Sequence, residues 1–252
     1  MSWEFQEFHD DAYRFLYGEM LSPERTEAEV AGIARMLALP EGARILDLCC
    51  GDGRHSVPLQ RRGFRVCGLD GAPVMLQRAR ERGARVLGEG QGPHWVRADA
   101  RFTPLRRGSV DAVVCLFNSL ALGDDDGNAR GFLREARSAL GTSGQLVAEL
   151  VHRDQQARAQ MPGGEIIREM IGGRLVQTRS WLDPIAGLQH ATFMWEEGGV
   201  RREKKLVYRI YTASEMVGMI REAGFSRVDV YGDYDGREFL IDSPLFVAHA
   251  RP

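Results

Sequence analysis

A glycine turn between a hydrophobic strand and a helix is the segment of this sequence best suited to hold a ligand. The strand is expected at 44–49, and the turn follows it as Gly51-Asp52-Gly53. Glycines there let the backbone adopt positive φ and approach a ligand closely, and the first N–H groups of the next helix are free to bind it. A dinucleotide-binding turn would carry a third glycine where Ser56 stands, and no Gly-Lys-Ser/Thr follows. The turn therefore fits neither of those two phosphate-binding patterns.

Three aspartates stand on or after successive expected strands. Asp47 lies on the first strand, Asp70 closes the second, and Asp99 follows the third. The carboxyl ends of parallel strands converge on the crevice where open α/β sheets bind ligands, and an acid ending the second strand is suited to accept hydrogen bonds from both hydroxyls of a ribose. Asp70 or Asp99 alone is equally well explained as an ordinary turn former. All three together with the glycine turn indicate a nucleoside-binding site.

The elements that must position these residues alternate between strand and helix. Short β-type runs and helical patterns follow one another through residue 151, which is typical of a parallel sheet built from right-handed βαβ units. The third helix is expected to stop at the loop Gly141-Thr-Ser-Gly144. Strands are expected at 44–49, 65–69, 94–97, 110–117 and 145–151, and helices at 54–61, 73–82 and 128–140.

A change of pattern after residue 151 indicates an insertion over the carboxyl edge of the sheet. A polar segment over 152–161 and a short helical piece before Gly172-Gly173 precede three strand-like runs, which indicate an antiparallel meander. A helix over 213–223 then has Thr212 and Glu215 at capping-box spacing. The predicted fold class is α/β, with a Rossmann-like seven-stranded sheet and an antiparallel β insertion. The meander strands are expected at 174–181, 188–196 and 200–211, and the last two strands of the main sheet at 227–231 and 245–250.

Consecutive segments of the sequence resemble the motifs of the class I S-adenosylmethionine-dependent methyltransferases. Four of them run Leu46-Asp-Leu-Cys-Cys-Gly-Asp-Gly-Arg-His55, Val66-Cys-Gly-Leu-Asp-Gly-Ala-Pro-Val-Met-Leu76, Ala98-Asp-Ala-Arg101 and Val110-Asp-Ala-Val-Val-Cys-Leu-Phe-Asn-Ser119. Later segments beginning at Tyr211, Glu222 and Val230 resemble a bacterial subgroup of small UbiE-like methyltransferases with a β insertion after the fifth strand. Two departures are Asp52, where the family usually has a small residue, and Gly71, where serine is common.

The resemblance implies that S-adenosylmethionine is the cofactor and that its methionine and ribose parts lie at the first two strands. By this resemblance Asp47, Gly51 and Gly53 form the loop at the methionine end, and Asp70 binds the ribose hydroxyls. Neighbouring motif residues are implied to contact the cofactor as well, namely Cys49, Arg54, His55 and Gly71.

The same resemblance places the adenine ring and the methyl group at the next two strands. Met75 is implied to pack on the ring, Asp99 to accept from its amino group, and Ala100 to offer a backbone contact beside it. These roles suit the chemistry, because an adenosyl group needs hydrogen-bond acceptors, an apolar slot and no cation beside its sulfonium. Arg101 is implied as a further cofactor contact, and Leu116, Phe117 and Asn118 as the boundary between cofactor and substrate.

Methyl transfer from a sulfonium needs little further help from the protein. The cofactor already activates this in-line displacement, and a neutral amine needs no base, whereas a phenol, alcohol or carbon acid benefits from one. The candidate base is His152, just after the fifth strand, and an exposed loop histidine is the alternative interpretation. Tyr13 and Tyr17 are expected either to close over the cofactor as a lid or simply to pack as an i, i+4 pair. Together with Asn118 and His152, these tyrosines are the expected substrate-binding residues.

The leading hypothesis is methylation of a small molecule at nitrogen, oxygen or carbon, and two alternatives remain open. An RNA or protein methyltransferase would use the basic run Arg201-Arg-Glu-Lys-Lys205 with Arg209, although such a run on an alternating strand is usually a solvated face. A catalytically silent cofactor-binding protein is the other. No Asn/Asp-Pro-Pro-Tyr motif follows the fourth strand, which argues against methylation of base amino groups or glutamine.

The composition is that of an ordinary globular chain. Of 252 residues, 44% are hydrophobic, and 33 basic residues face 35 acidic ones, so the net charge favours neither nucleic acid nor an anionic membrane as partner. The apolar stretch 112–117 is far too short to span a membrane, and the acidic N-terminus lacks the features of a signal peptide. We therefore expect a cytoplasmic monomer or homodimer without membrane contact.

The chain is expected to form one methyltransferase domain without a metal. The cysteines form no C-x-x-C pair and have apolar neighbours, so they predict buried thiols. The expected parts are an N-terminal helical lid over 1–40, a cofactor-binding core over 41–151, an insertion or substrate cap over 152–211, and the C-terminal part of the sheet over 212–252.

Overall fold

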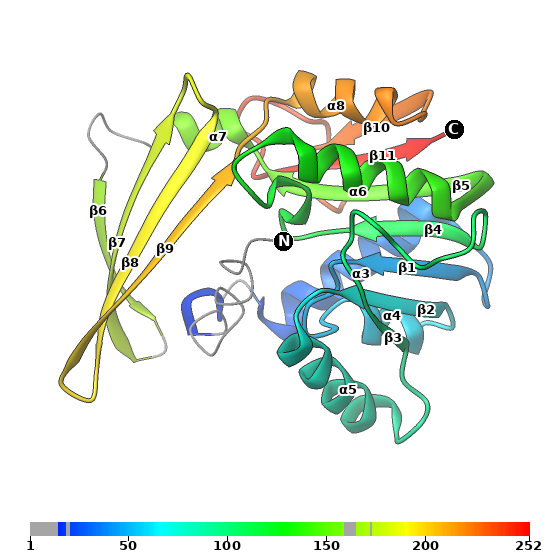
Figure 1. Ribbon diagram of the computed structural model, residues 1–252, viewed down its shortest axis with the longest axis horizontal. Helices are drawn as coiled ribbons and strands as arrows, with labels where there is room; N and C mark the ends of the chain where they lie inside the picture. The colour runs from blue at the N-terminus through cyan, green and yellow to red at the C-terminus, as the bar shows by residue number, and fades with distance from the viewer. Residues whose placement is uncertain (1–14, 19–20, 159–164, 172) are drawn as a thin grey trace.

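The computed structural model describes residues 15–18, 21–158, 165–171 and 173–252, and its centre is a seven-stranded sheet (Figure 1). The strands are β1 (Arg44–Leu48), β2 (Arg65–Asp70), β3 (His94–Arg97), β4 (Val110–Cys115), β5 (Leu140–Val151), β10 (Arg227–Tyr231) and β11 (Leu245–Arg251). Their order is β10-β11-β5-β4-β1-β2-β3. All neighbours from β3 to β5 are parallel, and β11 is antiparallel to both β5 and β10. This arrangement confirms the predicted fold class.

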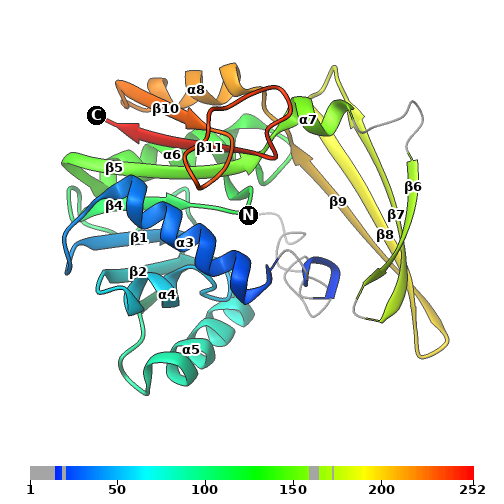
Figure 2. The ribbon, with the colours of Figure 1, turned by 180° about the vertical axis from the view of Figure 1, so that it is seen from behind.

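Helices cover both faces of this sheet. Figure 2 shows α3 lying across one face, while α6 and α8 lie on the other. Ile45 of β1 joins a core with Ile33 of α3, whereas the next residue, Leu46, joins a second core with Leu133 of α6. Side chains alternate across a strand, so strands buried on both faces are continuous hydrophobic runs. The helices are α3 (Pro23–Leu37), α4 (Ser56–Arg61), α5 (Pro73–Leu87), α6 (Asp126–Ala139), α7 (Arg153–Arg158) and α8 (Ala213–Glu222).

The insertion between β5 and α8 is a separate four-stranded antiparallel sheet beyond the carboxyl ends of β1 and β4 (Figure 1). Its strands, in order, are β6 (Glu165–Ile171), β7 (Arg174–Asp183), β8 (Leu188–Glu197) and β9 (Val200–Arg209). The helical piece expected before Gly172-Gly173 was wrong, because that segment is β6 and pairs with β7 along its whole length. The pairing reaches Ile171 and Arg174, so strand pairing overrides the local helical pattern.

Other element boundaries differ from the expectation for identifiable reasons. The expected loop 141–144 lies inside β5, because Leu140 already pairs with Val110 and the register shifts before Gln145 pairs with Ala112. The polar segment after β5 contains α7. The capping box of α8 is present, with Thr212 accepting from the Glu215 N–H and the Glu215 carboxylate accepting in return. No described helix is long and apolar enough to cross a membrane.

Candidate active site

A cleft opens where the carboxyl ends of β1 and β4 face strand β9 of the insertion. The wall on the sheet side comes from the glycine turn after β1 and from the ends of β4 and β5, and the opposite wall comes from Leu206 and Tyr208. Of the residues singled out from the sequence, those that line it are Tyr17, Asp47, Cys49, Gly51, Arg54, His55, Met75, Leu116, Phe117 and Asn118. Gly53, Asp70, Gly71, Asp99, Ala100, Arg101 and His152 are not among the lining residues, and Tyr13 lies outside the described residues.

The glycine turn is tightly built, and two of its positions require glycine. Gly51 and Gly53 have φ of 55° and 73°, in the left-handed region that residues with a side chain rarely adopt. A Cβ on Gly53 would lie 2.7 Å from a ring carbon of Trp95, and one on Gly51 would lie 3.4 Å from Cε of Met75. The turn therefore passes close to Met75, and both Gly51 and Met75 line the cleft.

Asp47 is buried beneath the turn and is held by Ser56. The Ser56 hydroxyl donates to Oδ2 of Asp47 at 2.5 Å. Burial raises the pKa of Asp47 to about 7, with the nearby Asp70 adding to the rise and the Ser56 hydrogen bond opposing it. Ser56, the residue that breaks the dinucleotide pattern, thus anchors a carboxyl group on the cleft wall.

Asp70 ends β2 with its carboxylate bound to the backbone on both sides. Oδ2 accepts from the Gly51 N–H at 2.9 Å, and Oδ1 accepts from the Ala72 N–H at 2.8 Å. A carboxylate has about four lone-pair sites, so each oxygen keeps acceptor capacity for a further donor. These contacts fix the Asp70 carboxylate against the glycine turn.

The end of β4 turns sharply into the cleft. Phe117 and Asn118 both have positive φ, at 54° and 62°, which is unusual for two successive residues with side chains. The turn is tied to β5, because the Phe117 N–H donates to Oε2 of Glu149 at 2.7 Å and the Asn118 N–H donates to the Glu149 carbonyl at 3.2 Å. The ring of Tyr17 meets the Phe117 ring edge-on, with centroids 5.8 Å apart.

Comparison with known proteins identifies the family. A methyltransferase domain family matches residues 45–144. A glycine/sarcosine N-methyltransferase from Parasynechococcus marenigrum is 31% identical, over 89% of this chain and 77% of its own length. The chain belongs to the class I S-adenosylmethionine-dependent methyltransferases. Among solved structures, the CcbJ methyltransferase from Streptomyces caelestis matches this methyltransferase with a TM-score of 0.77 and 25% identity over 89% of each chain. CalS10, an amino pentose methyltransferase from Micromonospora echinaspora, matches with a TM-score of 0.59 and 26% identity over 89% of this chain and 90% of its own.

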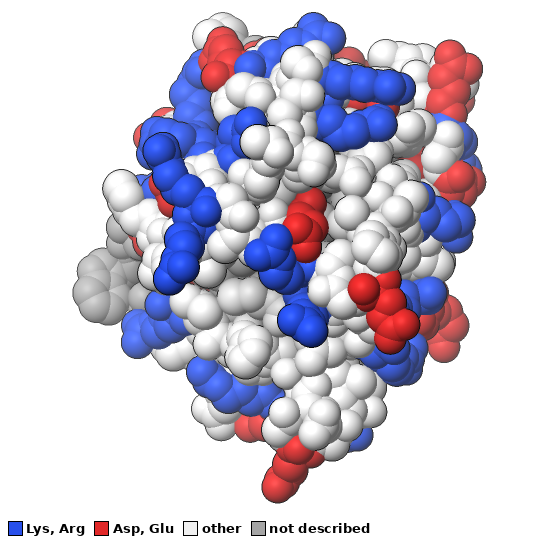
Figure 3. All heavy atoms as spheres, turned by 90° about the vertical axis from the view of Figure 1, so that its right-hand side faces the viewer, with Lys and Arg blue, Asp and Glu red and all other residues white. Residues whose placement is uncertain are grey.

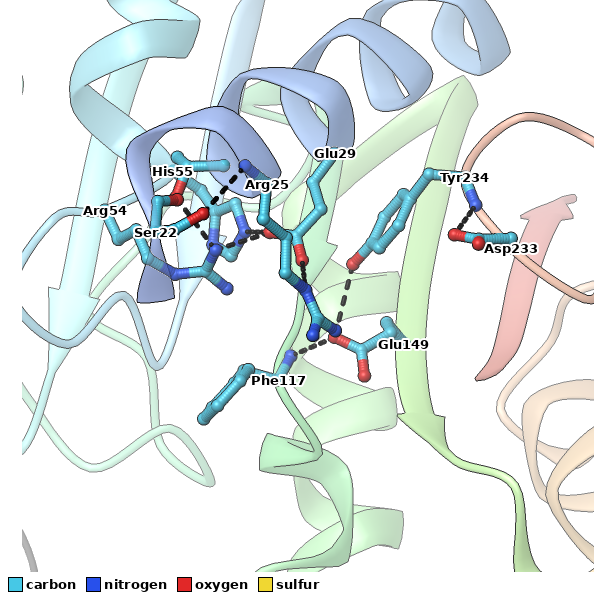
Figure 4. A network of polar contacts seen from close by, with 10 residues as sticks. Ser22, Arg25, Glu29, Arg54, His55, Phe117, Glu149, Asp233 and Tyr234 are labelled. Atoms are coloured by element: carbon cyan, nitrogen blue, oxygen red, sulfur yellow. Dashed lines mark hydrogen bonds and ion pairs between the residues drawn. The ribbon is translucent and has the colours of Figure 1, made fainter. Parts of the chain in front are cut away.

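A buried ionic network in this methyltransferase borders the cleft on the side of α3 (Figure 4). Glu29 of α3 accepts from Arg54 at 2.5 Å and contacts Nε2 of His55 at 2.9 Å. Burial alone would raise the pKa of Glu29, but His55, Arg54 and Arg25 lower it to about 2. Nη2 of Arg54 is buried without a hydrogen-bond partner among the described residues, and the guanidinium lies 5.3 Å from the centroid of the Phe117 ring.

Sequence reasoning missed Glu29, Glu149 and Tyr234 in the methyltransferase. A signal for Glu29 is available, since it stands four residues before Ile33 on the apolar stripe of its helix, where an acid must be paired to be buried. Glu149 interrupts an otherwise apolar strand, which is a comparable signal. Tyr234 gives none, because it lies in an irregular connection after β10.

His152 lies in a buried position after β5. It is only 2% exposed, so the exposed-loop alternative was wrong. Its Nδ1 lies 2.8 Å from the Ser243 carbonyl oxygen, and its ring packs on Phe239 with centroids 4.5 Å apart. These contacts hold the imidazole away from the cleft lining, so the geometry adds no support to its predicted role as a base.

The residues implied for the far end of the cofactor form a small group of their own. The Asp99 carboxylate accepts from the Arg101 N–H at 2.9 Å and from the Arg101 guanidinium at 2.6 Å. The hydrogen bonds from Arg101 lower the pKa of Asp99. Asp99 is therefore an ionised and partly exposed acceptor, and Ala100, which separates it from Arg101 in the sequence, is buried.

Basic side chains of the methyltransferase are spread over its surface and mixed with acids. On β9 the run 201–205 is mostly exposed, and Arg202 and Lys205 pair with Glu197 and Glu203. Figure 3 shows the side turned away from the insertion, where basic and acidic side chains are scattered among uncharged residues. The described residues include no group of three acids, histidines or cysteines able to hold a metal ion.

Proposed function

We propose that this methyltransferase transfers a methyl group from S-adenosylmethionine to the amino nitrogen of a small molecule. The observation that carries the proposal is the shape of the cleft, whose walls come from the core sheet, Tyr17 and strand β9. A substrate enclosed by both sheets must be compact. The relatives named as glycine/sarcosine N-methyltransferases support nitrogen as the acceptor, and the amino pentose methyltransferase supports a small substrate that carries an amino group.

We also propose the subgroup of this methyltransferase and the roles of the parts of its chain. The insertion between β5 and α8 supports a place in the small UbiE-like subgroup. The contact of Tyr17 with Phe193 of β8, at a centroid distance of 6.2 Å, supports a lid role for the segment before α3 within 1–40. Helix α3 packs on the main sheet. Within the single domain, we assign the cofactor-binding core to 41–151 and the C-terminal part of the sheet to 212–252. The segment 152–211 is the proposed cap, because residues of β9 line the cleft. We further propose a cytoplasmic monomer or homodimer, which size-exclusion chromatography with light scattering will test.

Residues of the cleft, together with strand-end residues beside it, fit the cofactor. Asp70 offers acceptors for the ribose hydroxyls, and Met75 over Gly51 offers an apolar face for the adenine. We assign Asp99 to the adenine amino group, and Asp47 with the glycine turn to the methionine end. The list of proposed cofactor contacts is completed by Cys49, Gly53, Arg54, His55, Gly71, Ala100, Arg101, Leu116 and Phe117.

The protein contributes binding, orientation and exclusion of water. S-adenosylmethionine supplies an activated methyl group on a positively charged sulfur. Holding an amine in line with that group is worth up to about 7–11 kcal/mol. The rigid Phe117–Asn118 turn, anchored on β5, fixes the boundary at which the two reactants meet. Tyr17, packed on Phe117, covers this point.

Methyl transfer to a panel of acceptors tests the proposed function. We expect S-adenosylhomocysteine to form with at least one of glycine, sarcosine, histamine or glucosamine, and not with phenol or with total RNA. Product is measured by mass spectrometry of both the nucleoside and the methylated amine. Transfer to phenol or RNA, with none to an amine, would overturn the proposal.

The pKa of Asp47 predicts a pH effect on cofactor binding. Its folded-state pKa of about 7 means that the carboxyl is neutral below pH 7 and negative above it. A negative Asp47 attracts the cationic sulfonium of S-adenosylmethionine but not the neutral sulfur of S-adenosylhomocysteine. Between pH 6 and pH 8 the preference for S-adenosylmethionine should therefore increase roughly fivefold. Calorimetric titration of both ligands at the two pH values measures it.

The Asp47→Asn variant is the control for this effect. An amide does not titrate, so the ratio of the two dissociation constants should stay constant with pH. A pH-dependent ratio that persists in Asp47→Asn would assign the effect to another group, and a constant ratio in the wild type would contradict the prediction.

A further inference from the structure

Glu149 is a buried acid that faces the cleft from the fifth strand. Its side chain lines the cleft beside Phe117 and Asn118, and the residue is 4% exposed. Nothing in the roles assigned so far uses its charge toward a substrate. Burying a carboxylate costs free energy unless the charge is paired or hydrogen-bonded. The hydrogen-bond partners of Glu149 therefore indicate its role.

The two oxygens of Glu149 have different surroundings. Oε2 accepts from the Phe117 N–H at 2.7 Å and from the hydroxyl of Tyr234 at 3.2 Å (Figure 4). Oε1 has no hydrogen-bond partner among the residues that the structure describes. One oxygen thus fixes the orientation of the group, and the other is left to a ligand in the cleft.

The groups that face Glu149 come from three further elements. Glu29 of α3 and Arg54, ahead of α4, form an ion pair on one side of it, and the hydroxyl of Tyr234, from the chain after β10, donates to it. Burial raises the pKa of Glu149, and the charge of Glu29 adds to the rise, while the Phe117 N–H, Arg54 and Tyr234 oppose it. Arg54 is already paired with Glu29. The charge of Glu149 therefore keeps no close ionic partner of its own among the described residues.

The ligand that this arrangement suits is an amine. Tyr17, Phe117 and Tyr208 surround the same part of the cleft, and aromatic faces attract cations that approach them. A free carboxylate oxygen adds a directed acceptor for an N–H group. A carboxylate or phosphate substrate group, by contrast, would be repelled by Glu149.

We propose that Oε1 of Glu149 accepts a hydrogen bond from the amino group of the substrate and receives the proton that this group loses. The inference rests on the proposed N-methylation. The lone pair of the amine forms the new nitrogen–carbon bond while the carbon–sulfur bond breaks, its electron pair remaining on sulfur. The nitrogen then carries a positive charge, and its proton passes to Glu149 and on to water. Atoms and charges balance without another reactant.

The Glu149→Gln variant tests this role. Glutamine keeps the size of the side chain and an oxygen for the Phe117 N–H, but it has no charge and does not accept a proton. For the amine that the wild type methylates best among glycine, sarcosine, histamine and glucosamine, kcat/KM should fall on the order of 100-fold. The dissociation constants of S-adenosylmethionine and S-adenosylhomocysteine should both stay within about twofold, as expected for a residue that acts on the acceptor. Glu149→Asp should restore part of the activity.

The wild-type pH profile gives a second readout that does not depend on a variant folding. Since the pKa of Glu149 is raised, kcat/KM should decline as the pH falls, with a midpoint above the ordinary range for glutamate, and this limb should be absent in Glu149→Gln. Glu135→Gln is the matched control. Glu135 on α6 accepts from Thr103 outside the cleft, so its loss should leave the kinetics unchanged.

Three results would overturn the inference. Unchanged kinetics in Glu149→Gln would remove the residue from the reaction. Weaker binding of S-adenosylmethionine with unchanged S-adenosylhomocysteine would place its charge at the sulfonium rather than at the amine. A wild type that methylates none of the four amines would refute the proposed function itself, and the inference with it, which distinguishes that failure from the first two.

Discussion

Replacing Asp70 by alanine should weaken the binding of both S-adenosylmethionine and S-adenosylhomocysteine on the order of 1,000-fold. A hydrogen bond to a charged acceptor contributes about 1.5–3 kcal/mol, and the carboxylate is proposed to accept from two ribose hydroxyls. The same carboxylate accepts from the N–H groups of Gly51 and Ala72, so its removal also releases the glycine turn. Both ligands carry the same ribose, and both should lose affinity equally.

Thermal unfolding with and without ligand measures this effect. A ligand at about 100 times its dissociation constant stabilises the wild type by about 2.7 kcal/mol, and this stabilisation should disappear in Asp70→Ala. Asp111→Ala is the control, because Asp111 pairs with Arg44 at the opposite end of the sheet and should leave the ligand response intact. Equal stabilisation of Asp70→Ala and wild type would remove Asp70 from the cofactor site.

The same experiment with NAD tests the interpretation of the glycine turn. Ser56 stands where a dinucleotide site needs its third glycine, and its hydroxyl is committed to Asp47. NAD should therefore give no stabilisation. Stabilisation by NAD would show that the turn accepts a pyrophosphate despite Ser56.

The main sheet was predictable because its strands carry a strong local signal. β1, β2 and β4 are buried on both faces and therefore appear as hydrophobic runs that end at polar residues or glycines. The insertion was harder, since its strands are only partly buried and their periodicity is weak. β6 illustrates the limit, because its conformation depends on pairing with β7 rather than on its own residues.

Within the site, the structure brings together those predicted residues that lie at the ends of adjacent strands. The glycine turn follows β1, and Asp70 ends β2. Because β1 and β2 pair in parallel, their carboxyl ends are adjacent and the turn contacts Asp70. Glu149 and Tyr234 meet only because α3, β5 and the chain after β10 fold together. His152 shows a limit of such reasoning, because a position after a strand end does not determine where a side chain points, and its proposed role stays a prediction.

Replacing Gly32 by alanine should destabilise the protein by roughly 3 kcal/mol, because α3 crosses the chain after β10 at this glycine. An added Cβ would collide with the Tyr234 carbonyl oxygen and lie 2.7 Å from the Tyr234 Cβ. Real Cβ atoms do not approach this closely, so α3 or Tyr234 must move. Inside a helix alanine would otherwise be favoured over glycine by about 0.5–1 kcal/mol. A net loss of stability in Gly32→Ala would therefore come from the collision with Tyr234.

Urea denaturation of Gly32→Ala measures the loss, and Gly218→Ala on α8 is its matched control. Around an added Cβ at Gly218 the described residues leave open space, so that substitution should stabilise the protein slightly. Moving Tyr234 also withdraws its hydroxyl from Glu149, so Gly32→Ala should lower methyl transfer even where it is fully folded. An unchanged denaturation midpoint would mean that α3 shifts away from Tyr234 without cost. The position of the Glu149 carboxylate would then not depend on this packing.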